Sequence, residues 1–372
     1  MNLGIYLGNQ SPTIGGGYSL IETVKKEILQ YNGNHNLFMF YHAKSKKMKR
    51  MENRITYINL WPWSIKRYIF DKILKTLGID LMIFLFPSTL KVTVPFIYTV
   101  WDLGHRMLPY FPETTCDGQF EDREATFQYM LPKATYILTG NKTGKKEILA
   151  NYAVNAEKIK IIPFPVTGFC FEKIDIPLMV DFIKEPFVFY PAQFWAHKNH
   201  IAIVEAINYL KKEKNVKINC YFVGSNKNSL EYIKTFIKQN DLEEQVKILG
   251  FVDYSILMYL YKNALAMVYV SLLGPNNLPP LEAVVLGCPS IVSNLPGHIE
   301  QMEGNSLFVD PLNFQEIADA IFKLYSEPDF RANMIEKGLE FAKKIEKYSY
   351  FSEVLKIVEQ FNILMRRLNS HE

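Results

Sequence analysis

The sequence has few cysteines, and they are widely spaced. Only 4 occur in 372 residues, and the nearest pair, Cys170 and Cys220, is far too separated to form a Cys-x-x-Cys motif. We therefore expect reduced, inert thiols and no disulfide framework. The chain also has no large excess of one charge, because 42 Lys and Arg face 38 Asp and Glu, a net charge of +4. This balance argues against a dedicated nucleic-acid binder, whose domain carries a dense basic face.

The pattern shows neither a secretory leader nor a membrane span. Residues 1–8 have no basic segment ahead of an apolar one and are typical of a strand, which predicts a cytoplasmic protein. The run 81–101 carries one charge, Lys91, but Pro87 and Pro95 interrupt it. Its two apolar pieces are short and rich in Ile, Val, Phe and Tyr. They favour two buried parallel strands over a span.

Short apolar runs alternate with amphipathic helical stretches along the chain, which is the pattern of a parallel α/β sheet. Strands are predicted at 2–7, 37–41, 56–60, 81–86, 96–100, 136–139, 160–162, 187–190, 218–223, 246–249, 265–270, 290–292 and 307–309. Helices are predicted at 18–29, 64–77, 120–130, 143–152, 200–211, 229–239, 254–261, 280–286, 314–324, 330–343 and 350–368.

Prolines mark a break in this alternation around 164–185, which lacks clean periodicity. We predict a first Rossmann-like domain over 1–165, a linker over 166–185 and a second Rossmann-like domain over 186–349. A last helix, about 350–372, is expected to pack back on the first domain. Two doubly wound domains should face a central cleft into which the carboxyl ends of their strands point.

In each predicted domain, one motif follows the first strand. Gly15, Gly16 and Gly17 precede a helix, where backbone N–H groups suit an anion, although a flexible turn explains them equally well. Lys198 follows the strand at 187–190, and a cation there could hold a diphosphate. A solvated surface lysine is the alternative.

Two further clusters carry polar side chains at predicted strand ends. The loop 273–283 leads into a helix with prolines in its first turn, and Glu282 either binds sugar hydroxyls or only complements the helix dipole. Asp102, His105 and Arg106 follow a first-domain strand. A helix cap or salt bridge explains Asp102 alone, but it explains the three together less well.

Three segments and the order of the motifs carry a family resemblance: Asn-Leu-Pro-Pro-Leu-Glu-Ala at 277–283, Gly-Cys-Pro-Ser-Ile-Val-Ser at 287–293 and Phe-Val-Asp-Pro at 308–311. On these residues the chain resembles glycosyltransferase family 4, the glycosyl transferases group 1. The resemblance implies an α/β fold of the GT-B type, in which two Rossmann-like, doubly wound parallel-sheet domains face a cleft. The first domain would bind the acceptor and the second a nucleotide sugar. It also implies a retaining reaction that needs no metal and no cofactor.

The resemblance assigns roles by position. Lys198 corresponds to the lysine that binds the donor diphosphate, Glu282 to the glutamate that binds the ribose, and the N–H groups of Asn277 and Leu278 reach the phosphates. The loop of Gly15 to Gly17, with Arg106, faces the phosphates or the acceptor. The catalytic candidates are Lys198, Asp102 and His105. The donor-binding candidates are Gln193, Lys198, Gly224, Ser225, Phe251, Val252, Asn276, Asn277, Leu278 and Glu282.

Three positions depart from the family pattern. Gln193 stands where many members have Arg, Gly274 replaces the first glutamate of the loop, and Trp101 replaces the histidine of a frequent His-Asp pair. Because Gly274 has no side chain, we expect a nearby amide to contact the donor sugar, Asn276 in preference to Asn277.

A basic cluster lies outside these motifs and is followed by Trp61 and Trp63. Such a surface suits an anionic membrane, and a solvated loop is an equal alternative. The cluster comprises Lys44, Lys46, Lys47, Lys49, Arg50 and Arg54.

Together these features predict a retaining hexosyltransferase that uses a nucleotide sugar, with UDP as the expected nucleotide. Its acceptor would be a glycan or a lipid-linked glycan of lipopolysaccharide or capsule synthesis, at the cytoplasmic face of the inner membrane. The alternatives are a sugar-nucleotide epimerase of the same architecture and a non-catalytic two-lobed sugar-binding protein.

Overall fold

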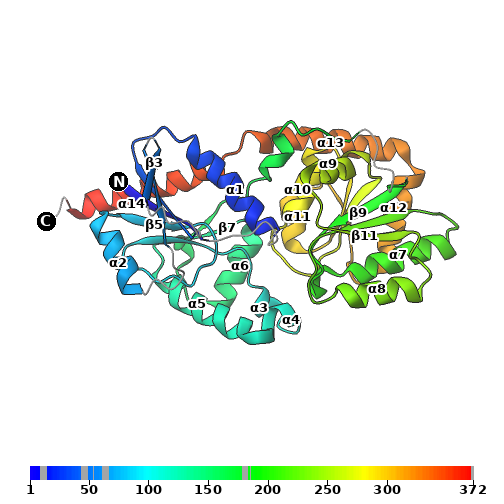
Figure 1. The fold of residues 1–372 in the computed structure, drawn as a ribbon, viewed down its shortest axis with the longest axis horizontal. Coiled ribbons are helices and arrows are strands. Elements are labelled where there is room, and N and C mark those ends of the chain that lie inside the picture. The colour runs from blue at the N-terminus through cyan, green and yellow to red at the C-terminus, as the bar shows by residue number, and fades with distance from the viewer. Residues whose placement is uncertain are drawn as a thin grey trace. The chain divides into compact units, whose positions relative to one another are not determined.

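The computed structural model describes residues 1–8, 15–42, 49–52, 54–60, 67–177, 183–184 and 186–369, without the side chains of 49–52, 67 and 68 (Figure 1). The chain divides into two compact units. The first comprises Met1–Leu103, Glu121–Pro165 and Ser349–Glu372, and the second comprises Gly104–Phe120 and Val166–Tyr348. Each unit is built on one sheet, and the predicted α/β class with two Rossmann-like domains is confirmed.

The first unit holds, among the described residues, an eight-stranded sheet of order β3-β4-β2-β1-β5-β6-β7-β8. Its strands are parallel except β3, which pairs antiparallel with β4 at the edge. Strand β3 was not predicted. Its Lys-Arg-Met-Glu sequence has no apolar face, as is common at sheet edges. The strands are β1 (Asn2–Gly8), β2 (Asn36–Tyr41), β3 (Lys49–Glu52), β4 (Ile55–Asn59), β5 (Leu81–Phe84), β6 (Phe96–Thr99), β7 (Tyr136–Thr139) and β8 (Ile159–Ile161).

The weakly charged run between Asp80 and Asp102 forms β5 and β6, as expected, and every residue of both strands is buried. No helix in the described ranges combines the length and the apolar character that crossing a membrane requires. The helices of this unit are α1 (Gly16–Leu29), α2 (Arg67–Thr76), α5 (Gln119–Lys133), α6 (Lys142–Asn151) and α14 (Tyr350–Asn369).

The second unit has a sheet of order β11-β10-β9-β12-β13-β14, and each described pair of neighbours is parallel. Counted within the unit this is the order 3-2-1-4-5-6 of a Rossmann fold. The strands are β9 (Phe187–Pro191), β10 (Asn219–Val223), β11 (Val246–Gly250), β12 (Ala266–Tyr269), β13 (Ser290–Ser293) and β14 (Leu307–Val309). The helices are α7 (His200–Lys212), α8 (Leu230–Gln239), α9 (Tyr254–Asn263), α10 (Leu278–Val285), α11 (Pro296–Met302), α12 (Phe314–Ser326) and α13 (Pro328–Glu346).

One short segment of the second unit comes from the first half of the chain. Residues Gly104–Phe120 form α3 (Gly104–Met107), α4 (Pro112–Thr115) and a 3₁₀ turn at Cys116–Gly118, and they group with Val166–Tyr348. Sequence periodicity gave no sign of this grouping, because each helix is a single turn and is too short to show an amphipathic repeat.

The last helix is tied to the first unit through Glu27 of α1. The Glu27 carboxylate accepts hydrogen bonds from the Ser349 hydroxyl (2.7 Å) and from the backbone N–H groups of Phe351 (2.7 Å) and Tyr350 (3.4 Å). These N–H groups belong to the first turn of α14, where a helix has no partner of its own for them. A side chain from α1 therefore acts as the N-terminal cap of α14.

Glu27→Ala is expected to weaken the docking of α14 by about 1–2 kcal/mol, the usual cost of losing a cap. Hydrogen–deuterium exchange of the α14 amides, read by mass spectrometry, should accelerate accordingly. The control is Glu22→Ala on the same helix, which removes only a surface pair with Lys25 (3.1 Å). Equal exchange of α14 in the two variants would contradict the capping role.

Candidate functional site

The sheet order of the second unit reverses between β9 and β12, which are neighbours in space but not in sequence. In open α/β sheets such a switch point opens a crevice at the carboxyl ends of the two strands. The turn with Lys198 leaves β9 there, and the loop 270–277 leaves β12. The lysine and the Asn-rich loop that the sequence singled out are thus brought together by topology.

The Lys198 turn is fastened to the neighbouring loop through its backbone. Leu272 donates its N–H to the His197 carbonyl (2.8 Å), and the Asn199 side chain donates to the carbonyls of Val270 (3.3 Å) and Pro311 (2.6 Å). Asn199 has a left-handed backbone (φ 57°), which lets the 3₁₀ turn at Ala196–Lys198 change direction into α7. The position of Lys198 is therefore set by the packing of two strand ends.

The Lys198 ammonium donates to three neutral oxygens. They are the Tyr269 hydroxyl (2.9 Å), the Ser271 hydroxyl (3.3 Å) and Oδ1 of Asn277 (3.3 Å). Tyr269 in turn donates to Oδ1 of Asn277 (2.7 Å). Burial raises the pKa of Tyr269 far above its ordinary value, so its hydroxyl stays neutral. This arrangement directs a half-buried cation toward the switch point.

Asn277 is held in one orientation by His298. Its Nδ2 donates to Nε2 of His298 (2.6 Å), and Nδ1 of the imidazole lies 3.2 Å from the Ser293 carbonyl, to which it donates. Burial lowers the pKa of His298 to about 4, so the ring is neutral at pH 7 with its proton on Nδ1. The Gln301 side chain accepts a hydrogen bond from the backbone N–H of Asn277 (3.1 Å) and donates one to the Asn277 carbonyl (2.9 Å).

Gly274 makes room for the Asn277 amide. Its φ is +116°, and a Cβ at this position would lie 2.7 Å from Nδ2 of Asn277. A side chain at 274 is therefore incompatible with the observed amide position. The neighbouring Asn276 has a buried Nδ2 that finds no hydrogen-bond partner in the part of the chain that is described.

Glu282 of α10 is 6% exposed, and both of its carboxylate oxygens are engaged. One accepts from the Thr167 hydroxyl and the other from the Tyr261 hydroxyl (2.8 Å). Burial raises the pKa of Glu282, against the opposing effect of these two hydrogen bonds. Its contact with a ribose stays a prediction.

The remaining donor-binding candidates lie along the carboxyl edge of β9, β10 and β11. The Gln193 amide donates to the Ser225 hydroxyl (3.0 Å) and accepts from the Trp195 indole (2.9 Å). A Cβ on Gly224 would lie 2.2 Å from the Ala192 carbonyl oxygen, so only glycine fits there. Beyond β11, Phe251 is 64% exposed and Val252 is half-buried.

The candidate site residues Asp102, His105 and Arg106 do not all belong to the same unit. Asp102 forms a salt bridge with Arg123 (2.7 Å) in the first unit. His105 is fully buried against Phe120, and the exposed Arg106 lies over the same ring (5.7 Å), both within the second-unit segment. The roles of these three residues stay predictions.

Two predicted surface features are described only in part. Gly15 has a φ of 78° just before α1, and Gly16 and Gly17 are its first two residues. Of the basic cluster, Lys44, Lys46 and Lys47 lie outside the described residues, as do Trp61 and Trp63, and Lys49 and Arg50 belong to β3 without described side chains. Arg54 is exposed and donates to the Gly33 carbonyl (2.9 Å).

Sequence reasoning missed four residues of the site. Tyr269 and Ser271 could have been found, because Tyr269 is the last residue of the strand that pairs with β9 and Ser271 follows two residues later, at the spacing of side chains that share one side of a strand. His298 and Gln301 carry no signal, since α11 is short and lies twenty residues beyond the loop that it supports.

The comparisons with known proteins agree with this geometry. Residues 181–341 match the family model described as Glycosyl transferases group 1. The matched residues lie within the second unit. The chain is 24% identical over 68% of its length to an uncharacterized glycosyltransferase of Methanocaldococcus jannaschii and 25% identical over 64% to an O-antigen chain mannosyltransferase of Salmonella typhimurium. These alignments span 67% and 64% of the two relatives.

Solved glycosyltransferase structures share the whole fold. A sucrose-phosphate synthase from Thermosynechococcus elongatus superposes with a TM-score of 0.74 at 16% identity, covering 99% of this chain and 100% of that one. Anabaena HepE in complex with UDP gives a TM-score of 0.69 at 16% identity, covering 97% and 100%. The GT-B architecture predicted from the sequence is confirmed.

Glu282→Gln is expected to become more stable relative to the wild type as pH rises. Because burial raises the folded-state pKa of Glu282, its carboxyl contributes stability below the ordinary value of 4.5 and loses it as pH climbs toward the folded pKa. The amide cannot ionise, so it escapes this loss, on the order of 1 kcal/mol for each unit of pKa shift.

Thermal midpoints of the two proteins at pH 5 and pH 8 provide the measurement. Glu231→Gln, whose side chain is 79% exposed, serves as the control and should show no such trend. A constant difference between Glu282→Gln and the wild type at both pH values would contradict a raised pKa of Glu282 in the folded protein.

Proposed function

We propose that the protein is a retaining glycosyltransferase that moves a hexose from a nucleotide sugar, with UDP as the nucleotide, to a glycan or lipid-linked glycan. The observation that supports it most is the Lys198 cluster at the switch point of the second unit, inside the region that matches the group 1 model. The named relatives are transferases, one of them an O-antigen chain mannosyltransferase, and this favours transfer over the epimerase and binding-protein alternatives.

Lys198 would stabilise the departing nucleoside diphosphate. Breaking the bond between the anomeric carbon and the diphosphate leaves negative charge on the phosphate oxygens, and a preorganised cation nearby lowers that barrier. In the free protein the ammonium donates to neutral oxygens, which release it more readily than a carboxylate would. The N–H of Leu278, at the start of α10, adds the partial positive charge of a helix N-terminus.

The choice of UDP follows from structural neighbours whose crystals contain it. HepE was crystallised with UDP and also with UDP and glucose. The surface glycan as acceptor follows from the O-antigen relative. Incubation with UDP-, GDP- and ADP-sugars, with products identified by mass spectrometry, tests the proposal. Transfer or slow hydrolysis supports it, epimer formation favours the epimerase, and no reaction with any donor overturns it.

Lys198→Ala is expected to reduce turnover by about 100-fold or more, because it removes the charge that acts on the developing diphosphate. Initial rates of transfer or donor hydrolysis measure the effect. Lys211→Ala is the control, since this lysine of the following helix donates only to the Asp241 carbonyl (3.1 Å) at the surface. Near-normal turnover in Lys198→Ala would remove the principal site assignment.

We expect substitutions of Asn276 and Asn277 to differ in their effect on UDP affinity. Asn277→Ala breaks the contacts with Lys198 and Tyr269, so both UDP affinity and turnover should fall several-fold. Asn276→Ala should lower turnover with little change in UDP affinity, because UDP alone lacks the sugar. Calorimetric titration with UDP, beside steady-state rates, makes the distinction, and equal losses of UDP affinity would contradict the separate roles.

A further inference from the structure

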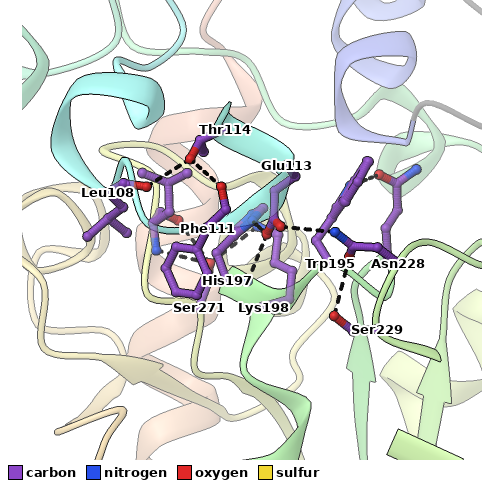
Figure 2. Close-up of polar contacts among 12 residues, drawn as sticks. Leu108, Phe111, Glu113, Thr114, Trp195, His197, Lys198, Asn228, Ser229 and Ser271 are labelled. Carbon is purple, nitrogen blue, oxygen red and sulfur yellow. Dashed lines mark hydrogen bonds and ion pairs between the residues drawn. The ribbon is translucent and has the colours of Figure 1, made fainter. Parts of the chain in front are cut away.

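We infer that Glu113 is a positioning residue for transfer, which holds the Lys198 turn from the segment Gly104–Phe120; the inference rests on the proposed function. Glu113 lies in α4, far from Lys198 in sequence and outside every motif identified above. Figure 2 shows its carboxylate directed at His197, the residue that precedes Lys198.

The carboxylate makes three contacts with the Val166–Tyr348 part of the same unit. Its Oε1 accepts from both the backbone N–H (2.9 Å) and the ring Nδ1 (2.5 Å) of His197, and its Oε2 accepts from Nδ2 of Asn228 (3.3 Å). The Glu113 side chain is 5% exposed and that of His197 is 11% exposed. The two contacts with His197 are therefore largely shielded from water, where a lost partner is costly, whereas the Asn228 contact is exposed.

Glu113 is charged in this setting. Burial by itself would raise the pKa of the Glu113 carboxyl, but the hydrogen bonds from His197 and Asn228 outweigh it and lower the pKa to about 2. Since an ionised carboxylate can only accept, Nδ1 of His197 must carry the proton. Charge-assisted bonds of this kind are about twice as strong as neutral ones.

The segment that carries Glu113 is braced internally. The Thr114 hydroxyl bonds to the carbonyls of Leu108 (2.8 Å) and Phe111 (2.7 Å), and the Phe111 ring meets the His197 ring edge-on at 6.1 Å (Figure 2). The segment leaves the first unit at Leu103 and returns to it at Glu121. Glu113 thus lies in a one-turn helix that the Thr114 hydroxyl fastens to the preceding residues.

Glu113 acts on Lys198 through the backbone of the preceding residue, His197. The Glu113 carboxylate fixes the N–H of His197, Leu272 fixes its carbonyl, and Tyr190 donates to the Lys198 carbonyl (2.8 Å). These contacts fix the position of the backbone from which the Lys198 side chain extends. A misplacement of about 1 Å at a catalytic group can cost on the order of 100-fold in rate. Loss of Glu113 should therefore reduce turnover more than it reduces UDP binding.

Three variants test this: Glu113→Gln, Glu113→Ala and the control Glu121→Ala, an exposed acid just beyond the segment. Glu113→Gln keeps the shape and one acceptor, so it remains usable if Glu113→Ala fails to fold. We expect kcat to fall about 10-fold in Glu113→Gln and up to 100-fold in Glu113→Ala, with UDP affinity lowered by less, while Glu121→Ala behaves as the wild type.

A double-mutant cycle separates positioning from general destabilisation. If Glu113 acts through Lys198, then Glu113→Gln in a Lys198→Ala background should change kcat by less than about 2-fold, because the group that it positions is gone. Multiplied losses in the double variant would overturn the inference.

Crystal structures of the wild type and Glu113→Gln decide the point independently of turnover. We expect the Lys198 ammonium to leave its hydrogen bonds with Tyr269 and Asn277 in the variant. An unmoved ammonium would overturn the inference even in an active enzyme. A wild type that transfers no sugar would refute the proposed function, and the two structures would still test whether Glu113 positions Lys198.

Discussion

The half-buried ammonium of Lys198 at the β9–β12 switch point is the constraint on which the rest of the site depends. Tyr269, Ser271 and Asn277 supply its neutral acceptors, and His298 orients the Asn277 amide. Burial keeps Tyr269 protonated and His298 uncharged at neutral pH, so the charge of Lys198 lies in a frame of neutral polar groups with fixed orientation. Such a frame binds an anion more strongly than water does, because it needs no reorganisation when charge develops.

The departures from the family pattern are accommodated as a set. Gly274 and Asn277 depend on each other, since a Cβ at 274 would lie within 2.7 Å of the Asn277 amide. Gln193 replaces a cation by an amide whose two ends are satisfied by Ser225 and Trp195. At 193 the chain has a neutral, hydrogen-bonded amide where the family pattern has a cation, and at 274 it has no side chain where the pattern has a carboxylate.

The sequence predicted the strands of both sheets well, because parallel strands buried on two faces read as short runs of Val, Ile, Phe and Tyr. It missed β3, whose charged edge sequence has no apolar face, and the short helices α3, α4 and α11. In the site, motif position led to Lys198, Asn277 and Gly274. His298, Gln301 and Glu113 act through contacts between segments distant in sequence, and a single sequence carries no record of those.

The most direct test is a crystal structure of the protein with UDP. The account predicts that an oxygen of the UDP diphosphate lies about 3 Å from the Lys198 ammonium, within ordinary charge-assisted hydrogen-bond distance, at the start of α10. In that complex the ammonium should exchange at least one of its contacts with Tyr269, Ser271 and Asn277 for the phosphate. A diphosphate bound elsewhere on the second unit, with the Lys198 contacts intact, would contradict the account.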